Sequence, residues 1–596
     1  MNTQIMFEQS ELALAAYASL NSSALSAQKA SLKDAGISDV QADTFASRYA
    51  VLTQYNDTVA EGGMGTSFSA TVFKDASGNL TLAIRGTLEA GDFVPTDANI
   101  AASGAGYDQI VAMWNWWLRV SNPAGVLVAQ YRLVPVPINP NQAVDLNGLW
   151  LEPMASAAAT GTLVDAINAD GDRKLDITGH SLGGHLAMVF GSLFAGVTNQ
   201  VTVFNAPGFS NTSANQNFFT RLGGSIPSGV NTTNVIADEA PVGVAPWLAI
   251  AGLHSRPGVA VNVSIENQWL SDEPNPTTGP WNHSQQMLTD ALAVYATLGK
   301  LDPSLTSATF KSILAAATVG TAGSLEHIID ALEGIFGINT ATLPVGNVNR
   351  DSLYQAIYDL QAATADIPAG TLTVRSLTAF NAAQIASIAQ NNIAYRYALL
   401  NLTPFALVGN DAVYDPHNAN GEIDLYDPAT GSGNLSDRYL QDRGAMLAWK
   451  MQFDTQDQSY GDDWNSLTTS GDWDFIDQAT LLDGQPLKLA IDGVSLGAPT
   501  HQIVFGSEQA DAGAAALTGG DNADRLYGGG GDHFLGGAGG VGVNGGEGDD
   551  YVEGGNPVLP YPETQLLYPE GELITGAGEG LHVGRVANDA NWRIAA

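Results

Sequence analysis

Residues Leu175 to Phe194, LDITGHSLGGHLAMVFGSLF, give the strongest indication of the fold in the first half of this chain. A β-like run from Lys174 to Thr178 leads into a Gly-x-Ser-x-Gly motif with Ser181 at its centre. Apolar residues then recur three and four positions apart, which is typical of a helix packed on a sheet: Leu186, Val189, Phe190, Leu193 and Phe194. A strand, a tight glycine-flanked turn and a helix present a serine hydroxyl for attack, so we predict that Ser181 is a nucleophile.

A second Gly-x-Ser-x-Gly motif surrounds Ser495. It is followed by Ala498-Pro499 and by the strand-like run His501 to Phe505, where a nucleophile turn requires a helix. We therefore assign no catalytic role to Ser495.

Around Ser181 the sequence alternates short β-like runs with helix-like runs. Leu80 to Arg85 and Gln200 to Asn205 are β-like, and Tyr107 to Val120 is helix-like. Such alternation predicts βαβ units around a largely parallel sheet.

A serine hydroxyl needs a base to take its proton and a carboxylate to orient that base. In folds of this kind the chain order is serine, acid, histidine. Of the nine histidines, only His254 and His283 follow the motif within the alternating region. His283 lies on a loop between the strand-like Val259 to Glu266 and the helix-like Gln285 to Tyr295. We predict His283 as the base and keep His254 as the alternative, or as a residue that borders the substrate groove.

The acid and the oxyanion hole are expected at the carboxyl ends of strands, where α/β sheets gather their functional groups. Asp238 directly follows the strand-like Thr233 to Ala237, and its neighbour Glu239 is the alternative acid. The oxyanion hole requires backbone N–H groups, one of them on the residue after the nucleophile. We predict the N–H groups of Leu182 and Thr87 as these donors.

Tryptophans and prolines are concentrated between Ala105 and Leu151. Because three tryptophans within four positions cannot all face one side of a helix, we favour a role at a lipid interface, with core packing as the alternative. The apolar run around three prolines is a candidate lid or interfacial loop. The residues concerned are Trp114, Trp116, Trp117 and Trp150, and Pro135, Pro137 and Pro140.

Composition excludes several classes of function. The chain has 596 residues, 45% of them hydrophobic, and its 61 acidic against 23 basic residues give a net charge of −38, which argues against nucleic-acid binding. It has no cysteine, so disulfides, thiolate metal sites and a cysteine nucleophile are excluded. The N-terminus carries Glu8 and Glu11 and predicts an amphipathic helix rather than a secretory signal. The longest apolar run, Val242 to Leu253, is shorter than the ~20 residues that cross a bilayer.

Beyond Gly506 the chain is rich in glycine and contains an internal repeat. Gly-Gly pairs recur at spacings of 9, 8, 9 and 9 from residue 519 to 554, which predicts a parallel β-roll with Ca²⁺ at its turns. Residues two repeats apart should share an ion, but Asp524 is matched by Val541 and Asp550 by His533. We therefore expect only weak calcium sites, with these candidate ligands: Asp524, Asp532, Asp549 and Asp550.

Together these residues carry two family resemblances. The IRGT stretch ending at Thr87, Asp97, GHSLGG and the order Asp238, His283 resemble the class 3 lipase branch of the α/β-hydrolases over residues 1–300. The glycine repeats resemble the RTX modules of bacterial secreted lipases and phospholipases over about residues 500–556. The resemblance implies ester hydrolysis on lipids without a cofactor for the chemistry, and structural Ca²⁺ in the β-roll. It also implies export by type I secretion machinery to the extracellular space, without a cleaved N-terminal signal peptide.

We therefore expect an α/β fold and a secreted serine carboxylic-ester hydrolase, a lipase that meets its substrate at an interface and binds no nucleic acid. The alternatives are a phospholipase A1 or polyester hydrolase with the same triad, or a non-catalytic exported structural or adhesion protein. The expected segments are an α/β-hydrolase catalytic domain (1–300), a helical segment (301–375), a mixed α/β segment (376–500), a degenerate β-roll (501–556) and a tail with an export signal (557–596).

Overall fold

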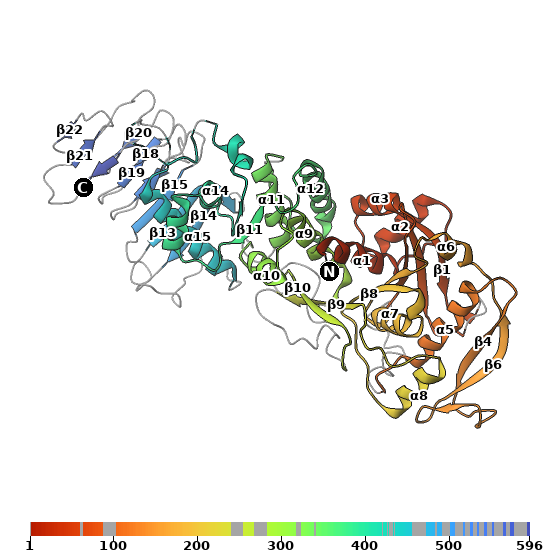
Figure 1. Ribbon diagram of the computed structural model, residues 1–596. Coiled ribbons are helices and arrows are strands. Elements are labelled where there is room, and N and C mark those ends of the chain that lie inside the picture. Colours follow the sequence, from red (N-terminus) through yellow and green to blue (C-terminus); the bar gives the residue numbers. More distant parts are fainter. Residues whose placement is uncertain are drawn as a thin grey trace. The chain divides into compact units, whose positions relative to one another are not determined.

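Figure 1 shows the protein as a computed structural model. The chain divides into two compact units: unit 1 comprises residues 1–314 and 343–370, and unit 2 comprises residues 315–342 and 371–596. Part of the expected helical segment, 301–314 and 343–370, thus belongs with the sheet that carries Ser181. The structure describes residues 2–59, 64–86, 103–239, 254–266, 283–317, 323–338, 341–419, 421–425, 427, 429, 433, 435–455, 473–482, 485–491, 501–506, 517–518, 525–527, 533–535, 542–544, 551–553, 564–567, 573–576 and 593–595.

Unit 1 is built on a seven-stranded sheet with the order β1-β2-β3-β7-β8-β9-β10. From β3 to β10 neighbouring strands pair in parallel, and β1 and β2 add an antiparallel edge. The predicted alternation of strands and helices is confirmed, and each predicted strand end lies within two residues of the observed one. The strands are β1 (Tyr49–Asn56), β2 (Ser69–Asp75), β3 (Leu80–Ile84), β7 (Leu175–His180), β8 (Thr198–Phe204), β9 (Thr232–Glu239) and β10 (Val259–Ile265).

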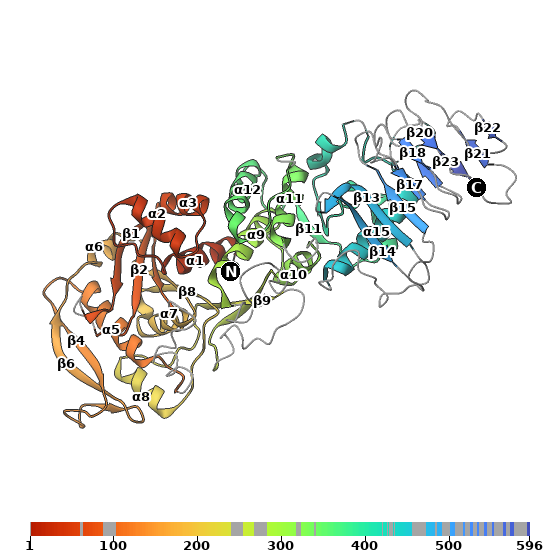
Figure 2. The ribbon, with the colours of Figure 1, turned by 180° about the vertical axis from the view of Figure 1, so that it is seen from behind.

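Helices cover both faces of this sheet, as Figures 1 and 2 show from opposite sides. Along β3, Leu82 is buried with α5 (Tyr107–Ser121) and α7 (Leu182–Leu193), whereas its neighbour Ala83 is buried with the N-terminal helix α1 (Thr3–Ala15). Successive strand residues point to opposite faces, so a strand covered on both sides is apolar at every position. The other α-helices in the described part of unit 1 are α2 (Leu25–Asp34), α3 (Asp39–Arg48), α6 (Val164–Ala169), α8 (Ser213–Arg221), α9 (Gln285–Leu301), most of α10 (Ser307–Ala316) and α12 (Arg350–Ala363).

The tryptophans of α5 are core residues, and the prediction that they serve a lipid interface is wrong. Trp114 packs against Tyr131 with ring centroids 5.1 Å apart, and Trp117 packs against Phe190 at 4.8 Å. Trp116 is 2% exposed. The helix lies between α7 and a β-hairpin, so apolar side chains on opposite sides of it are buried by different neighbours.

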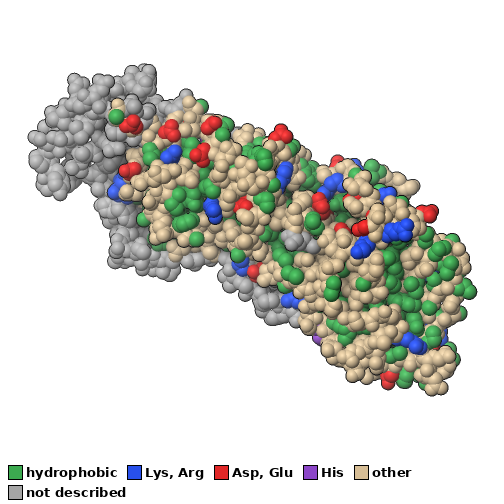
Figure 3. Space-filling model, in the orientation of Figure 1, with side chains coloured by type: hydrophobic (Ala, Val, Ile, Leu, Met, Phe, Trp, Pro, Cys, Tyr) green, Lys and Arg blue, Asp and Glu red, His purple; other side chains and the backbone are tan. Residues whose placement is uncertain are grey.

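That hairpin is formed by β4 (Leu127–Val134) and β6 (Trp150–Ala158), with β5 (Val144–Asp145) added at the edge of β6. It carries exposed hydrophobic side chains: Val126, Leu127, Val136, Ile138 and Met154. Figure 3 shows hydrophobic side chains gathered over this part of unit 1. The predicted proline-flanked apolar run, from Pro135 to Pro140, connects β4 to β5 in this exposed region.

Unit 2 combines helices with parallel ladders of short strands. Strands β15, β17 and β19 pair in parallel in one ladder, and β16, β18 and β20 pair in parallel in another. In helix α15, the buried Arg443 donates to Asp477 of β13 at 2.7 Å. The elements are α11 (Ser324–Phe336), α13 (Ala382–Ala389), α14 (Ile393–Leu400), α15 (Asp437–Thr455), β11 (Thr373–Ser376), β12 (Phe405–Val408), β13 (Trp473–Leu482), β14 (Gln485–Ile491), β15 (His501–Phe505), β16 (Leu517–Thr518), β17 (Arg525–Tyr527), β18 (His533–Leu535), β19 (Gly542–Asn544), β20 (Tyr551–Glu553), β21 (Thr564–Leu567), β22 (Leu573–Gly576) and β23 (Arg593–Ala595).

Candidate active site

Ser181 lies on the sharp turn between β7, which ends at His180, and α7, which begins at Leu182. Its backbone has φ 57° and ψ −127°, a combination that residues with a Cβ rarely adopt. Such a conformation costs about 1–3 kcal/mol and persists where the surrounding structure enforces it. The predicted strand, turn and helix around Ser181 are therefore confirmed. The second motif, around Ser495, lies outside the described residues, and β15 follows it, as predicted.

The glycines of the motif allow the backbone to pack closely at this turn. A Cβ on Gly183 would overlap the carbonyl oxygen of Ile84, and one on Gly179 would overlap the carbonyl oxygen of Gly183. A Cβ on Gly184 would lie 2.7 Å from that of Ala206. Because these contacts involve backbone or rigid Cβ atoms, side chains at these three positions would push α7 away from the sheet.

The imidazole of His283 contacts the hydroxyl of Ser181. Its Nε2 lies 2.9 Å from Ser181 Oγ, although 102 residues separate the two in the chain. A neutral imidazole accepts a proton on Nε2 in this arrangement, which is the geometry required of a general base.

The start of α9 anchors the chain next to His283. The hydroxyl of Ser284 caps the helix by accepting from the backbone N–H of Met287. The side-chain amide of Gln285 donates to the backbone carbonyl of Ser10 in α1 at 3.1 Å. Two independent contacts therefore hold the chain immediately after the base.

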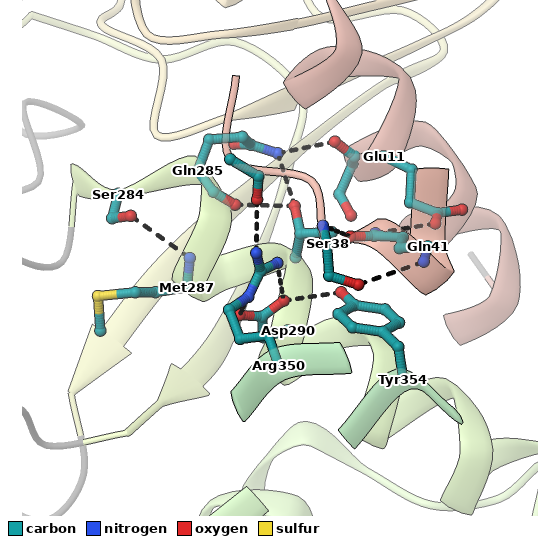
Figure 4. A network of polar contacts seen from close by, with 12 residues as sticks. Glu11, Ser38, Gln41, Ser284, Gln285, Met287, Asp290, Arg350 and Tyr354 are labelled. Atoms are coloured by element: carbon teal, nitrogen blue, oxygen red, sulfur yellow. Dashed lines mark hydrogen bonds and ion pairs between the residues drawn. The ribbon is translucent and has the colours of Figure 1, made fainter. Parts of the chain in front are cut away.

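Figure 4 shows the polar network that continues from this anchor. Asp290, on α9, accepts two hydrogen bonds of 2.7 Å from the Nε and Nη2 of Arg350 on α12. The Tyr354 hydroxyl donates to the same carboxylate at 2.7 Å. A further Arg350 nitrogen donates to the Gly36 carbonyl at 2.6 Å. Residues from outside the expected catalytic domain thus fix the helix that follows the base.

His254, the alternative base, is engaged elsewhere. Its Nδ1 lies 2.8 Å from the Oγ of Ser210 rather than near Ser181. The structure therefore brings His283, not His254, to the predicted nucleophile.

Asp238 lies at the carboxyl end of β9, one position before the last residue of the strand. Its carboxylate accepts from Lys311 Nζ at 2.8 Å. The structure thus brings Ser181 and His283 together, whereas the hydrogen bond described for the Asp238 carboxylate is to Lys311. The side chain of Glu239, the alternative acid, lies outside the described residues.

One of the two predicted oxyanion donors is within the described chain. Leu182 is the first residue of α7, where backbone N–H groups have no partner within the helix. Thr87 lies outside the described residues, but its neighbour Gly86 follows β3 and is level with Ser181 in the parallel register of β3 and β7. A Cβ on Gly86 would lie 3.3 Å from the Cβ of Ser181.

Sequence reasoning missed two residues beside the base, Tyr17 and His180. The Tyr17 hydroxyl is 2.8 Å from His180 Nδ1, and His180 Nε2 is 2.8 Å from the backbone oxygen of His283. Burial, and then the neighbouring His283, lower the pKa of His180 well below its ordinary value. The position of His180 inside the motif was visible in the sequence, but nothing in the pattern connected it with Tyr17.

His185, in the first turn of α7, is a buried structural histidine. Its Nδ1 donates to the carbonyl of Pro207 and its Nε2 accepts from the backbone N–H of Gly106, each at 3.4 Å. Burial lowers the pKa of His185 to about 4, so the ring is neutral at neutral pH.

The expected calcium ligands, Asp524, Asp532, Asp549 and Asp550, all lie outside the described residues. Within the described ranges, no cluster of three or more His, Asp or Glu side chains is arranged to hold a metal ion. None of the described helices is long and apolar enough to span a membrane.

Comparison with solved structures finds fungal lipases over less than half of this chain. Lip2 lipase from Yarrowia lipolytica is 16% identical, with 44% of this chain and 78% of that chain covered and a TM-score of 0.22. The lipase from Rhizopus microsporus var. chinensis is 13% identical, with 47% and 85% covered and a TM-score of 0.23. No protein-family model and no curated protein sequence matches. The likeness concerns the fold, and the chemistry is argued from the site.

Proposed function

We propose that unit 1 is a serine carboxylic-ester hydrolase that cleaves long-chain acyl esters of lipids. One observation carries the proposal: Ser181 Oγ, on a strained strand-to-helix turn, lies 2.9 Å from His283 Nε2. An unactivated serine hydroxyl is a poor nucleophile, and an imidazole at this distance removes its proton as the attack proceeds.

The reaction proceeds in two steps. In the first, Ser181 attacks the ester carbonyl while His283 takes the hydroxyl proton and then gives it to the departing alcohol. In the second, His283 takes a proton from water as the water attacks the acyl-enzyme, and it gives that proton to Ser181 Oγ as the bond to the acyl group breaks and the acid leaves. The N–H groups of Leu182 and Thr87 stabilise the negative oxygen in both steps, and the position of Leu182 at the start of α7 supports this role.

Asp238 is proposed to orient His283. Its position at the end of β9, two strands from β7, supports the assignment because it follows the serine and precedes the histidine in the chain. In this proposal the carboxylate exchanges Lys311 for the imidazole. The Asp238–Lys311 pair is about one-third exposed, so breaking it costs little.

The acyl group is proposed to be long and apolar. The β4–β6 hairpin exposes several hydrophobic side chains, and Ile138 is 82% exposed. An exposed group of hydrophobic side chains on the domain that carries Ser181 supports a lipid over a water-soluble ester as the substrate.

A series of p-nitrophenyl esters from butyrate to palmitate tests the proposed function. We expect wild-type protein to hydrolyse the series and the Ser181→Ala variant to lose turnover. The matched control is Ser210→Ala, which removes the serine hydroxyl that contacts His254 instead of His283 and should retain activity. Absence of turnover in wild type, or full turnover in Ser181→Ala, would favour the non-catalytic alternative.

We further propose that residues 501–556 form a β-roll with weak structural Ca²⁺ sites and that the protein is exported by type I secretion. The alternating parallel ladders of β15 to β20 support the β-roll. Calorimetric titration with Ca²⁺ tests the metal sites, and assay of culture medium against cell extract tests the export.

A further inference from the structure

The hydroxyl of Tyr17, the ring of His180 and the backbone of His283 form a continuous chain of contacts. Tyr17 lies two residues beyond the end of α1, and His180 is the last residue of β7. Both hydrogen bonds of the chain are 2.8 Å long. The N-terminal segment, the residue before Ser181 and the proposed base are thereby connected.

The chemistry of the partners shows which atom donates in each of these two hydrogen bonds. The carbonyl oxygen of His283 can only accept, so His180 Nε2 carries the hydrogen and donates it. In a neutral ring Nδ1 is then the acceptor, and the Tyr17 hydroxyl donates to it. Burial lowers the pKa of His180, which keeps the ring in this neutral form.

We propose that Tyr17 and His180 are positioning residues for His283, an inference that rests on the proposed esterase function. His180 holds the carbonyl of His283 and packs against its ring, with centroids 4.7 Å apart and planes tilted by 40°. Tyr17 fixes the rotation of the His180 ring by occupying its other nitrogen. The base is thus held at its backbone and at one ring face, so that Nε2 stays directed at Ser181.

A neutral His180 suits the role of positioning His283. When the base takes the serine proton it becomes a cation, and a second charged imidazole at this separation would oppose that step. Because His180 is neutral and its N–H already points to the backbone oxygen, it adds no such repulsion.

Tyr17 also lies against the strand that leads to the proposed oxyanion donor. A Cβ added to Gly86 would overlap the Tyr17 hydroxyl and lie 2.6 Å from the carbonyl oxygen of His180. The hydroxyl therefore fills the space between the ends of β3 and β7. Its loss should disturb the proposed oxyanion side of the site as well as the base.

Steady-state kinetics on a p-nitrophenyl ester test this positioning role. We expect Tyr17→Phe to lower kcat about tenfold, the effect of losing one buried hydrogen bond, with KM within about twofold. His180→Leu should lower kcat about 100-fold, as expected for a base displaced by ~1 Å. His180→Gln keeps an amide N–H that can reach the His283 carbonyl, so it should recover about tenfold of that loss. Tyr55→Phe, which removes a tyrosine hydroxyl bonded to Asp57 away from the site, is the matched control and should behave as wild type.

The outcomes separate this inference from the proposed function. Wild-type protein without Ser181-dependent turnover contradicts the function itself. Ser181-dependent turnover with unchanged kcat in both Tyr17→Phe and His180→Leu contradicts only the positioning role. Equal losses in His180→Gln and His180→Leu, with a raised KM or a lowered melting temperature, would indicate mere packing and also overturn it. If His180→Leu fails to fold, Tyr17→Phe decides, because it removes a single oxygen atom.

Discussion

Replacing His283 by alanine should abolish turnover, whereas replacing His254 should not. His283 Nε2 contacts the Oγ of Ser181 at 2.9 Å, while His254 contacts the Oγ of Ser210 at 2.8 Å. The two variants remove the same side chain from similar hydrogen bonds to serine. They differ in which serine loses its partner.

The expected magnitudes follow from these contacts. Without its base, a serine hydrolase loses about 10⁵- to 10⁶-fold in kcat, which corresponds to about 7–8 kcal/mol of transition-state stabilisation. His254→Ala should lose one partly buried hydrogen bond, about 1 kcal/mol of folding stability, and keep kcat near that of wild type.

Initial rates on p-nitrophenyl butyrate, with protein concentration raised for the slow variant, measure both effects. Circular dichroism and thermal melting confirm that each variant is folded. The reasoning would be refuted if His254→Ala lost turnover while His283→Ala retained it, because the contact at Ser181 would then have no catalytic meaning.

Three further predictions concern the acid, the network behind the base and pH. Asp238→Asn should lower kcat about 10⁴-fold through loss of imidazole orientation, whereas Lys311→Met should change kcat little; comparable rates in the two would remove Asp238 from the mechanism. Arg350→Met leaves the buried carboxylate of Asp290 without its cation (Figure 4) and should lower the free energy of unfolding in urea by about 3–5 kcal/mol. A loss below about 1 kcal/mol would show that this ion pair does not fix α9. His185 has its pKa lowered to about 4, so the unfolded chain binds its proton first and stability falls as pH drops from about 6.5 to 4, by about 3 kcal/mol. The free energy of unfolding should differ less between pH 7 and pH 4.5 in His185→Gln than in wild type. The same difference in both proteins would count against a neutral buried ring.

Much of the fold was predictable because its signals are local. The strand β7, the turn at Ser181 and helix α7 are specified by glycine spacing and apolar periodicity within twenty residues of sequence. The parallel sheet followed from the alternation of such segments. The same local rules predicted a helix just after His283, and the structure confirms that α9 begins two residues after it.

Packing against distant segments was not predictable, and it produced the clearest error. The tryptophans of α5 looked too widely distributed around the helix for one buried face. The structure covers the helix from two sides, by α7 and by the β4–β6 hairpin, so Trp114 and Trp117 are both buried. A periodicity shows that several faces are apolar, but not what covers each one.

Local residue patterns are enough to specify the nucleophile turn, the alternating strands and helices and the short list of candidate histidines, because each depends on neighbours a few residues apart. Long-range packing selects His283 over His254, pairs Asp238 with Lys311 and brings Tyr17 to His180. These choices depend on contacts between residues 44 to 163 positions apart. Such contacts are set by how the strands stack and where the loops cross, and no local pattern of residues encodes them.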